Sequence, residues 1–252
     1  MTNHYLQLIL YKTYADLRVE AARGYLGMLW WVLEPVLYMG AFYIIFGIAL
    51  KRGGEGFVPY LLTGLVAWKW FDTSVRMSAT SIMAGRGLMS QVYLPKIFFP
   101  AVMVAKNSVK FLVTLLLLII FLLIYGMDPG WNWFALPLII IVQLLLIGAC
   151  ASMVAAVIPL WPDLQMLVNN GLMLMFFLSG IFFDTSAVGG MLGTLLDLNP
   201  MIHVIDAYRA VLLENSWPAL PALGVVTGFS LLGMLLGLRL LRRYDKLYPR
   251  LA

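Results

Sequence analysis

Residues 111–125 read Phe-Leu-Val-Thr-Leu-Leu-Leu-Leu-Ile-Ile-Phe-Leu-Leu-Ile-Tyr, an apolar run without a single charge. Lys106 and Lys110 stand just before this run. About 20 predominantly apolar residues cross the hydrocarbon core of a bilayer. The run therefore predicts the centre of a transmembrane helix over about residues 100–125, with the two lysines extending toward the cytoplasmic headgroups.

The composition of the whole chain indicates that most of its surface faces lipid. Of its 252 residues, 62% are hydrophobic and 12% are charged, and the mean hydropathy is +0.91. A soluble domain has about 25% charged residues, because its surface must be solvated. The sequence therefore predicts an all-α integral membrane protein, a single transmembrane domain over residues 1–252 with room for about six crossings. The net charge of +5 is typical of basic residues on the cytoplasmic side of a membrane protein, and no nucleic-acid partner is expected.

Five further apolar stretches complete the predicted set of six spans. They cover about residues 29–50, 58–83, 133–158, 164–183 and 217–240. An N-terminal helix over residues 4–22 is interrupted by charges, so we expect it to lie along the membrane interface. A cytosolic arm without a membrane role is the alternative for this helix.

The distribution of the 17 lysines and arginines predicts that both termini face the cytoplasm. With the N-terminus inside, 13 of them lie on the cytoplasmic side or at its boundary; only Lys51, Arg52 and Arg209 lie outside, and Lys69 lies within a span. Basic residues favour the cytoplasmic side of a membrane protein. Two inward termini require an even number of crossings, which six spans satisfy.

Two charged side chains fall inside the predicted second span. Lys69 and Asp72 are three residues apart, so they can pair on one face of a helix. Charges inside a membrane are costly and usually functional. The pair is a candidate polar site on a transport pathway, and a self-neutralising ion pair at a helix interface is the alternative.

Aromatic side chains are concentrated in the first two predicted spans. Their rings can stack on the apolar C–H patches of sugars, which would give a glycan chain an unspecific track. The alternative is an interfacial aromatic belt together with ordinary packing. The candidate channel residues are Trp31, Tyr38, Phe42, Phe46, Trp68 and Phe71.

The sequence offers no convergent catalytic constellation. His203 and Asp206 are three residues apart, but no nucleophile or set of metal ligands joins them, and Cys150 is the only cysteine. No lysine follows a glycine, which excludes a Walker A phosphate loop. We therefore expect a transport subunit rather than an enzyme, with no cofactor in this chain and with ATP hydrolysis on a separate partner.

Several motifs resemble those of ATP-binding-cassette permeases of the polysaccharide-export type. Residues 23–35 read Arg-Gly-Tyr-Leu-Gly-Met-Leu-Trp-Trp-Val-Leu-Glu-Pro, residues 60–64 read Tyr-Leu-Leu-Thr-Gly, residues 94–100 read Leu-Pro-Lys-Ile-Phe-Phe-Pro, and Leu198-Asn-Pro200 is followed by Tyr208-Arg209. The resemblance covers nearly the whole chain. Two departures are Pro162-Asp163, where the family often has Arg-Asp, and Ser179-Gly180, where it often has Ser-Pro.

The resemblance implies a complex and a substrate that the spacing of residues does not show. Two permeases would assemble with two ATPase subunits, which bind ATP and Mg, and export a lipid-linked polysaccharide such as O-antigen or capsule across the bacterial inner membrane. Residues 184–216, too apolar for a free loop, would form short re-entrant helices at the outer face. Residues 84–94 would form a coupling helix that contacts the ATPase, with candidate contacts at Arg86, Gly87, Leu88, Gln91 and Tyr93.

Two other functions remain compatible with the residues. One is a related permease for a small hydrophobic drug or lipid. The other is a membrane-embedded enzyme acting on lipid-linked sugars, for which His203 and Asp206 would be the candidate groups.

Overall fold

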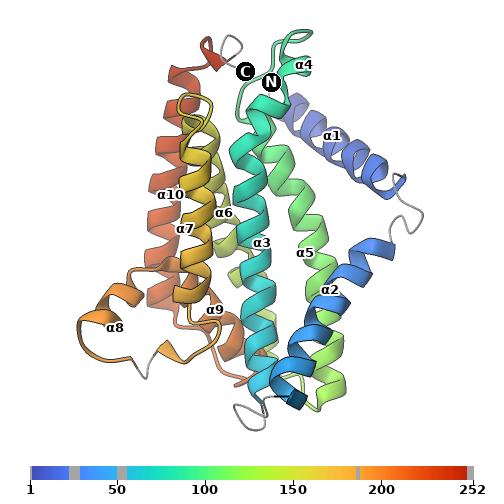
Figure 1. Cartoon of the computed structure of the whole chain (residues 1–252), viewed down its shortest axis with the longest axis vertical. Coiled ribbons are helices and arrows are strands. Elements are labelled where there is room, and N and C mark those ends of the chain that lie inside the picture. The colour runs from blue at the N-terminus through green and yellow to red at the C-terminus, as the bar shows by residue number, and fades with distance from the viewer. Residues whose placement is uncertain (1, 23–28, 50–55, 186–187, 249–252) are drawn as a thin grey trace.

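The computed structural model shows the chain as a bundle of helices that run along its long axis (Figure 1). It describes residues 2–22, 29–49, 56–185 and 188–248. Within these ranges every regular element is a helix, which confirms the predicted all-α class. Residues 23–28 of the first motif, together with Lys51 and Arg52, lie outside the described residues.

Four apolar helices in the described ranges are long enough to cross a membrane. The first is α2 (Leu29–Phe42), which continues as a π-helical segment η1 (Tyr43–Ala49). The others are α5 (Phe98–Tyr125), the short 3-10 helix η2 (Trp131–Ala135) with α6 (Leu136–Val157), and α10 (Leu220–Arg243). They fall where the sequence predicts the first, third, fourth and sixth spans.

Helix α3 (Phe57–Ala84) covers the predicted second span but is less apolar. Its 28 residues correspond to about 42 Å at 1.5 Å per residue. Lys69, Asp72 and Arg76 lower its hydropathy. Helices α5, α6, α7 and α9 all contact α3, and most of its other side chains are buried (Figure 1). A helix enclosed by protein does not need a fully lipid-like surface. Helix α3 can therefore be less apolar than the four helices that are apolar enough to cross a membrane by composition.

Helix α7 (Leu164–Leu178) covers the predicted fifth span with 15 residues. It ends at Ser179 and Gly180, where Gly180 has a φ of +66°. This left-handed conformation favours glycine, because a Cβ would be strained there. The chain therefore turns at the position where the sequence departs from the Ser-Pro that related permeases often have.

Helices α6 and α10 make the most extensive helix–helix contact in the described chain. A Cβ atom at Gly237 would lie 2.3 Å from the Ser152 Oγ and 2.8 Å from the Ser152 Cβ. Glycine at this position lets the two backbones approach closely, as is typical of membrane helix pairs.

Both termini lie at one end of the bundle, together with α1 (Thr2–Ala22) and α4 (Arg86–Met89) (Figure 1). Helix α1 covers the range predicted for the interfacial helix and packs against α5. Thr13 and Leu17 are buried, whereas Leu6, Leu10 and Tyr14 are exposed. The helix is thus divided between a side in contact with protein and an outward apolar surface.

The C-terminal residues are part of the packing at this end. Tyr248 is fully buried, and its hydroxyl donates to the Ala156 carbonyl at 2.9 Å. Burial raises the pKa of Tyr248 to about 12. Lys96 is also buried; it donates to the Leu94 carbonyl at 3.1 Å and lies 3.9 Å from the Asp245 carboxylate. The lysine of the motif at residues 94–100 therefore links the chain before α5 to the C-terminal segment.

At the opposite end lie two short helices, α8 (Gly190–Asp197) and α9 (Pro200–Leu212) (Figure 1). The Asn199 side chain accepts a hydrogen bond from the Met201 amide at 3.0 Å, with Pro200 in the first turn of α9. An asparagine cap followed by proline is a strong helix start. The Leu198-Asn-Pro200 motif therefore begins α9, and most of the side chains of this helix are buried against α3 and α6.

Two motifs distant in sequence meet beside α9. The guanidinium of Arg209 lies 3.4 Å from the centroid of the Tyr60 ring and donates to the carbonyls of Ile181 (3.2 Å) and Tyr60 (3.4 Å). A Cβ atom at Gly64 would lie 3.0 Å from this guanidinium. Residues 60–64 and 208–209 therefore form one contact that joins α3, α9 and the end of α7.

Candidate functional site

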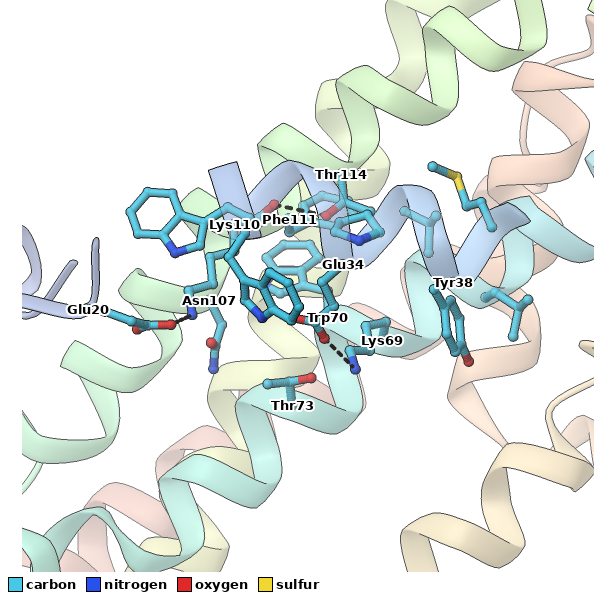
Figure 2. A pocket seen from close by; sticks show the side chains of 16 residues that line it. Glu20, Glu34, Tyr38, Lys69, Trp70, Thr73, Asn107, Lys110, Phe111 and Thr114 are labelled. Carbon is cyan, nitrogen blue, oxygen red and sulfur yellow. Dashed lines mark hydrogen bonds and ion pairs between the residues drawn. The ribbon is translucent and has the colours of Figure 1, made fainter. Parts of the chain in front are cut away.

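A cavity of about 170 Å³ lies between α1, α2, α3 and α5 (Figure 2). Helix α2 forms one wall, although only 6% of the residues in its span are buried within the chain. The residues with polar or aromatic side chains that line the cavity include Glu20 from α1, Trp31, Glu34 and Tyr38 from α2, Lys69, Trp70 and Thr73 from α3, and Asn107, Lys110 and Thr114 from α5.

Two sets of ion pairs connect the helices around this cavity. The Lys69 ammonium lies 3.4 Å from the Glu34 carboxylate, which joins α3 to α2 (Figure 2). Glu20 pairs with Lys106 at 3.3 Å and also with Lys110, which joins α1 to α5. Burial raises the pKa of Glu20, but the two ammonium groups outweigh this effect and hold the pKa below its usual range. The two lysines before the apolar run thus bind the end of α1 as well as standing near the predicted headgroup level.

The predicted Lys69–Asp72 ion pair is wrong. Instead, the Nε of Arg76, one turn further along α3, donates to both carboxylate oxygens of Asp72, at 2.8 and 2.9 Å. Arg76 also donates to the Asn169 side chain on α7 at 3.0 Å. Spacings of three and four residues both place charges on one helix face, and the arginine at the longer spacing reaches both carboxylate oxygens. Lys69 is then directed to α2.

Three of the four aromatic residues predicted in the first span, Tyr38, Phe42 and Phe46, form a series of ring contacts along α2 and η1. Tyr38 and Phe42 are 5.0 Å apart between ring centroids, and Phe42 and Phe46 are 6.0 Å apart. Trp31 lies 5.8 Å from the Lys110 ammonium, measured to the ring centroid. Trp31 and Tyr38 line the cavity, whereas Phe46 contacts the Phe182 ring after α7.

Trp68 and Phe71 lie elsewhere. They are 5% and 3% exposed and belong to the core, where Trp68 contacts Phe71 at 5.4 Å and Phe176 of α7 at 6.0 Å between ring centroids. In this conformation of the single chain they fill the interface of α3 and α7 rather than an open path. The sequence grouped them with the first-span aromatics because closeness in sequence does not show which neighbouring helix covers a given face of α3.

Two polar residues of the cavity wall were not identified from the sequence. Trp70 stacks on Phe111 with ring centroids 4.0 Å apart, and its Nε1 atom has no hydrogen-bond partner among the described residues. The Oδ1 atom of Asn107 also has none, while its Nδ2 donates weakly to the Met77 sulfur at 3.5 Å. An asparagine inside an apolar helix was the signal that could have marked this site, because such residues are usually functional or hydrogen-bonded.

The predicted coupling segment forms an exposed surface beside the termini. The predicted helix over residues 84–94 is reduced to the last residue of α3 and the single turn of α4; the chain then turns and runs without regular structure to Pro95. A helix is disfavoured at Leu94, which precedes the proline. Arg86, Gly87, Gln91 and Tyr93 are exposed and Leu88 is half-buried. The Tyr93 hydroxyl donates to Asp245 at 2.9 Å, and this hydrogen bond raises the pKa of Tyr93.

His203 and Asp206 make contacts with other partners. The His203 ring is 2.8 Å from the Asp197 carbonyl, and Asp206 lies 3.3 Å from the Arg209 guanidinium. Among the residues that the structure describes, no group of three or more His, Cys, Asp or Glu side chains could hold a metal ion. Neither arrangement supports the enzyme alternative.

The helical bundle, with four apolar helices of span length in the described ranges, is that of a membrane-spanning protein. The chain belongs to the ABC-2 type transporter family, whose model matches residues 12–213. The protein is therefore a membrane-spanning permease of this family.

Relatives of known description match nearly the whole chain. It is similar to the O-antigen export system permease protein RfbA of Myxococcus xanthus, with 29% identity over 88% of each chain. The RfbA protein of Klebsiella pneumoniae is 27% identical over 83% of this chain and 81% of its own. The polysialic acid transport protein KpsM of Escherichia coli is 24% identical over 92% of this chain and 91% of its own.

Proposed function

We propose that this chain is the channel-forming permease subunit of an ATP-driven exporter that moves a lipid-linked polysaccharide, such as O-antigen or capsule, from the cytoplasmic side across the bacterial inner membrane. The observation that carries this proposal is that relatives named for O-antigen export and for polysialic acid transport align over more than four fifths of the chain. The family gives the transporter class, and the names of these relatives supply the substrate class.

The proposed topology has six crossings: the four apolar helices together with α3 and α7. The 15 residues of α7 extend about 22 Å, less than the hydrocarbon core of about 30 Å. Residues 179–181, which follow it, are buried within the protein. Non-helical backbone at membrane depth is tolerated where protein covers it. This supports α8 and α9 as re-entrant helices at the outer face. Six crossings put both termini on one side of the membrane, and the proposed side is the cytoplasm, where basic residues are favoured.

The proposed complex contains a second copy of this chain and two copies of an ATPase subunit that bind ATP and Mg. Residues 84–94 are the proposed contact with the ATPase. The support is their exposure and their position at the same end of the bundle as both termini (Figure 1). The aromatic series of α2 is the proposed surface for the sugar chain.

Deletion of the gene in its own host tests the function, with surface polysaccharide measured by glycan extraction and electrophoresis. We expect loss of the surface glycan and its accumulation inside the cell. Normal surface glycan after deletion would contradict the proposal and favour the small-molecule or lipid permease. Stimulation of ATPase activity by hydrophobic compounds would then identify that alternative.

Complementation of the same strain tests the sugar path. The triple variant Trp31→Ala, Tyr38→Ala and Phe42→Ala should impair export while the ATPase still co-purifies. Trp131→Ala is the matched control, because Trp131 is 85% exposed and does not line the cavity. Equal export by the triple variant and the control would exclude a role for the α2 aromatics in the path.

A further inference from the structure

Helix α10 packs one side against α6 and leaves the opposite side open along most of its length. The buried residues recur on the first side: Leu223, Val226, Ser230, Gly237 and Leu241. Exposed residues on the opposite side include Val225, Leu232, Leu235, Leu236, Arg239, Arg242 and Arg243. With 3.6 residues per turn, these exposed positions fall within an arc of about 120°. They therefore form one continuous surface, the open face of α10.

The chemistry of the open face changes within one turn. Residues 220–238 contain no charged side chain, and Arg239, Arg242 and Arg243 then follow. Within the described ranges, none of these three guanidinium groups pairs with a carboxylate. The nearest acid in the sequence, Asp245, lies beside a buried lysine of another segment instead. The arginine cluster of residues 239, 242 and 243 therefore carries a positive charge that no described acid of this chain compensates.

The length of the uncharged part of α10 places the arginine cluster at the level of the lipid headgroups. Residues 220–238 extend about 28 Å at 1.5 Å per residue, close to the hydrocarbon thickness of about 30 Å. Trp217, which is exposed, stands just before this stretch at its other end, and tryptophan is enriched at the membrane interface. The cluster then lies at the opposite interface, at the end of the bundle that holds both termini (Figure 1).

An anionic phospholipid is the partner that this depth and this charge favour. A guanidinium group presents a planar set of N–H donors that matches the oxygens of a phosphate. The phosphate of phosphatidylcholine is balanced by its own ammonium group, whereas phosphatidylglycerol keeps a net negative charge. Each basic residue near the membrane surface favours anionic lipid by about fivefold in binding. The apolar part of the open face also offers a surface for acyl chains, which a soluble acidic protein would leave unused.

We propose that the arginine cluster and the last apolar turns of the open face form a binding site for an anionic phospholipid of the cytoplasmic leaflet. The lipid phosphate accepts hydrogen bonds from the guanidinium groups, and the acyl chains lie along Leu235 and Leu236, which are both exposed. The site is independent of the exported substrate. It takes from the proposed function only the assignment of this end of the bundle to the cytoplasm.

A fluorescent label on the open face measures which lipid lies beside the cluster. Bimane is attached to Leu235→Cys, one turn before Arg239, in a full chain that also carries Cys150→Ser. The matched control carries the label at Val225→Cys, on the same face but about 21 Å from Arg239 along the helix. Each chain is reconstituted in mixtures of phosphatidylglycerol and phosphatidylcholine, with quenching bromine atoms on the acyl chains of one lipid and then of the other.

At the Leu235 position we expect phosphatidylglycerol to be preferred by at least about fivefold, because three charges act together. At the Val225 position the two lipids should quench equally. The preference should weaken in about 0.5 M NaCl because salt screens the charges, and sodium phosphate of equal ionic strength should have no larger effect.

Two triple variants separate the charge of the cluster from its shape. Arg239→Gln, Arg242→Gln and Arg243→Gln together should abolish the preference at the Leu235 position. The corresponding change of all three arginines to lysine keeps the charge but loses the planar fork, so most of the preference should remain. If the glutamine variant does not fold, the single variant Arg242→Gln and the salt dependence of the wild type decide.

Four results would overturn the site. The first is equal quenching by the two lipids at the Leu235 position, and the second is a preference that survives the glutamine variant. The third is weak quenching by both lipids at Leu235 but not at Val225, which would show that a second copy of the chain covers this part of the face. The fourth is a larger loss of preference in phosphate than in chloride, which would identify free phosphate as the ligand.

Discussion

Replacement of Arg209 by lysine should destabilise the end of the bundle that contains α9. The guanidinium stacks on the Tyr60 ring and donates to two backbone carbonyls. A desolvated cation–π contact contributes about 2 kcal/mol, and a hydrogen bond from a charged donor about 1.5–3 kcal/mol. An ammonium group keeps the charge and part of the hydrogen bonding but loses the planar stacking. We therefore expect a net loss of about 2–4 kcal/mol.

Thermal unfolding of the purified full chain in detergent measures this loss. One kcal/mol corresponds to about 2–4 °C for a protein of this size, so Arg209→Lys should lower the melting temperature by roughly 4–16 °C. Arg239→Lys on the exposed side of α10 is the matched control and should change it by less than about 2 °C, as is usual for exposed surface positions. A change in Arg209→Lys no larger than that of the control would refute the view that this contact holds α3, α9 and the end of α7 together.

Three other perturbations have defined outcomes. The Gln143 side chain donates to the Ala67 carbonyl of α3 and accepts from the buried Tyr208 hydroxyl at 2.9 Å. Gln143→Leu should lower the free energy of unfolding by about 2–4 kcal/mol, and Tyr208→Phe added to it should restore part of this loss, because the hydroxyl left without a partner is removed. A double-mutant cycle of melting temperatures measures both effects. A Cβ at Gly85 would lie 2.1 Å from a buried phenylalanine ring of α5, whereas one at Gly87 meets nothing within 4 Å. Gly85→Ala should therefore lower the free energy of unfolding by about 1–3 kcal/mol, and Gly87→Ala should leave it almost unchanged. Equal melting temperatures of the two variants would contradict this packing. The pKa of Glu20 is held below its usual value of 4.5. The α1–α5 contact should therefore be constant from pH 8 to about 5.5 and weaken only as the pH falls through the folded-state pKa. Spin-label distances between the two helices measure this, and a Glu20→Gln variant should show no such acid transition.

The sequence was sufficient to predict the class of fold because the bilayer imposes lengths that can be counted. Apolar runs of span length gave the helices at residues 100–125 and 217–240, and the apolar composition of residues 184–216 agreed with the helices found there. The helix of residues 58–83 was placed correctly even though its three charges reduce its hydropathy. The enclosure of its other side chains by neighbouring helices is a tertiary property that no local pattern contains.

The site was harder to predict because partner choice depends on how neighbouring helices are rotated. The spacing of Lys69 and Asp72 shows that they share a face of α3. In the structure, however, Lys69 forms an ion pair with Glu34 of α2, and Asp72 forms one with Arg76. The sequence did not mark Asn107 as a site residue, because its place in the cavity wall is shared with Trp70, which lies on another helix. Spacing therefore predicts candidate pairs within one helix, and the contacts between helices decide among them.

A few polar contacts at the cavity hold α2 in place within this chain. In a bilayer, apolar side chains gain little by leaving lipid for protein, so polar contacts and close packing must position a helix. Little of α2 is buried within this chain, and its described polar contacts include the Glu34–Lys69 ion pair and the approach of the Trp31 ring to Lys110. Both lie beside the cavity and both leave the apolar face of α2 uncovered by this subunit. The same few charges that neutralise the cavity therefore also hold α2 against α3 and α5.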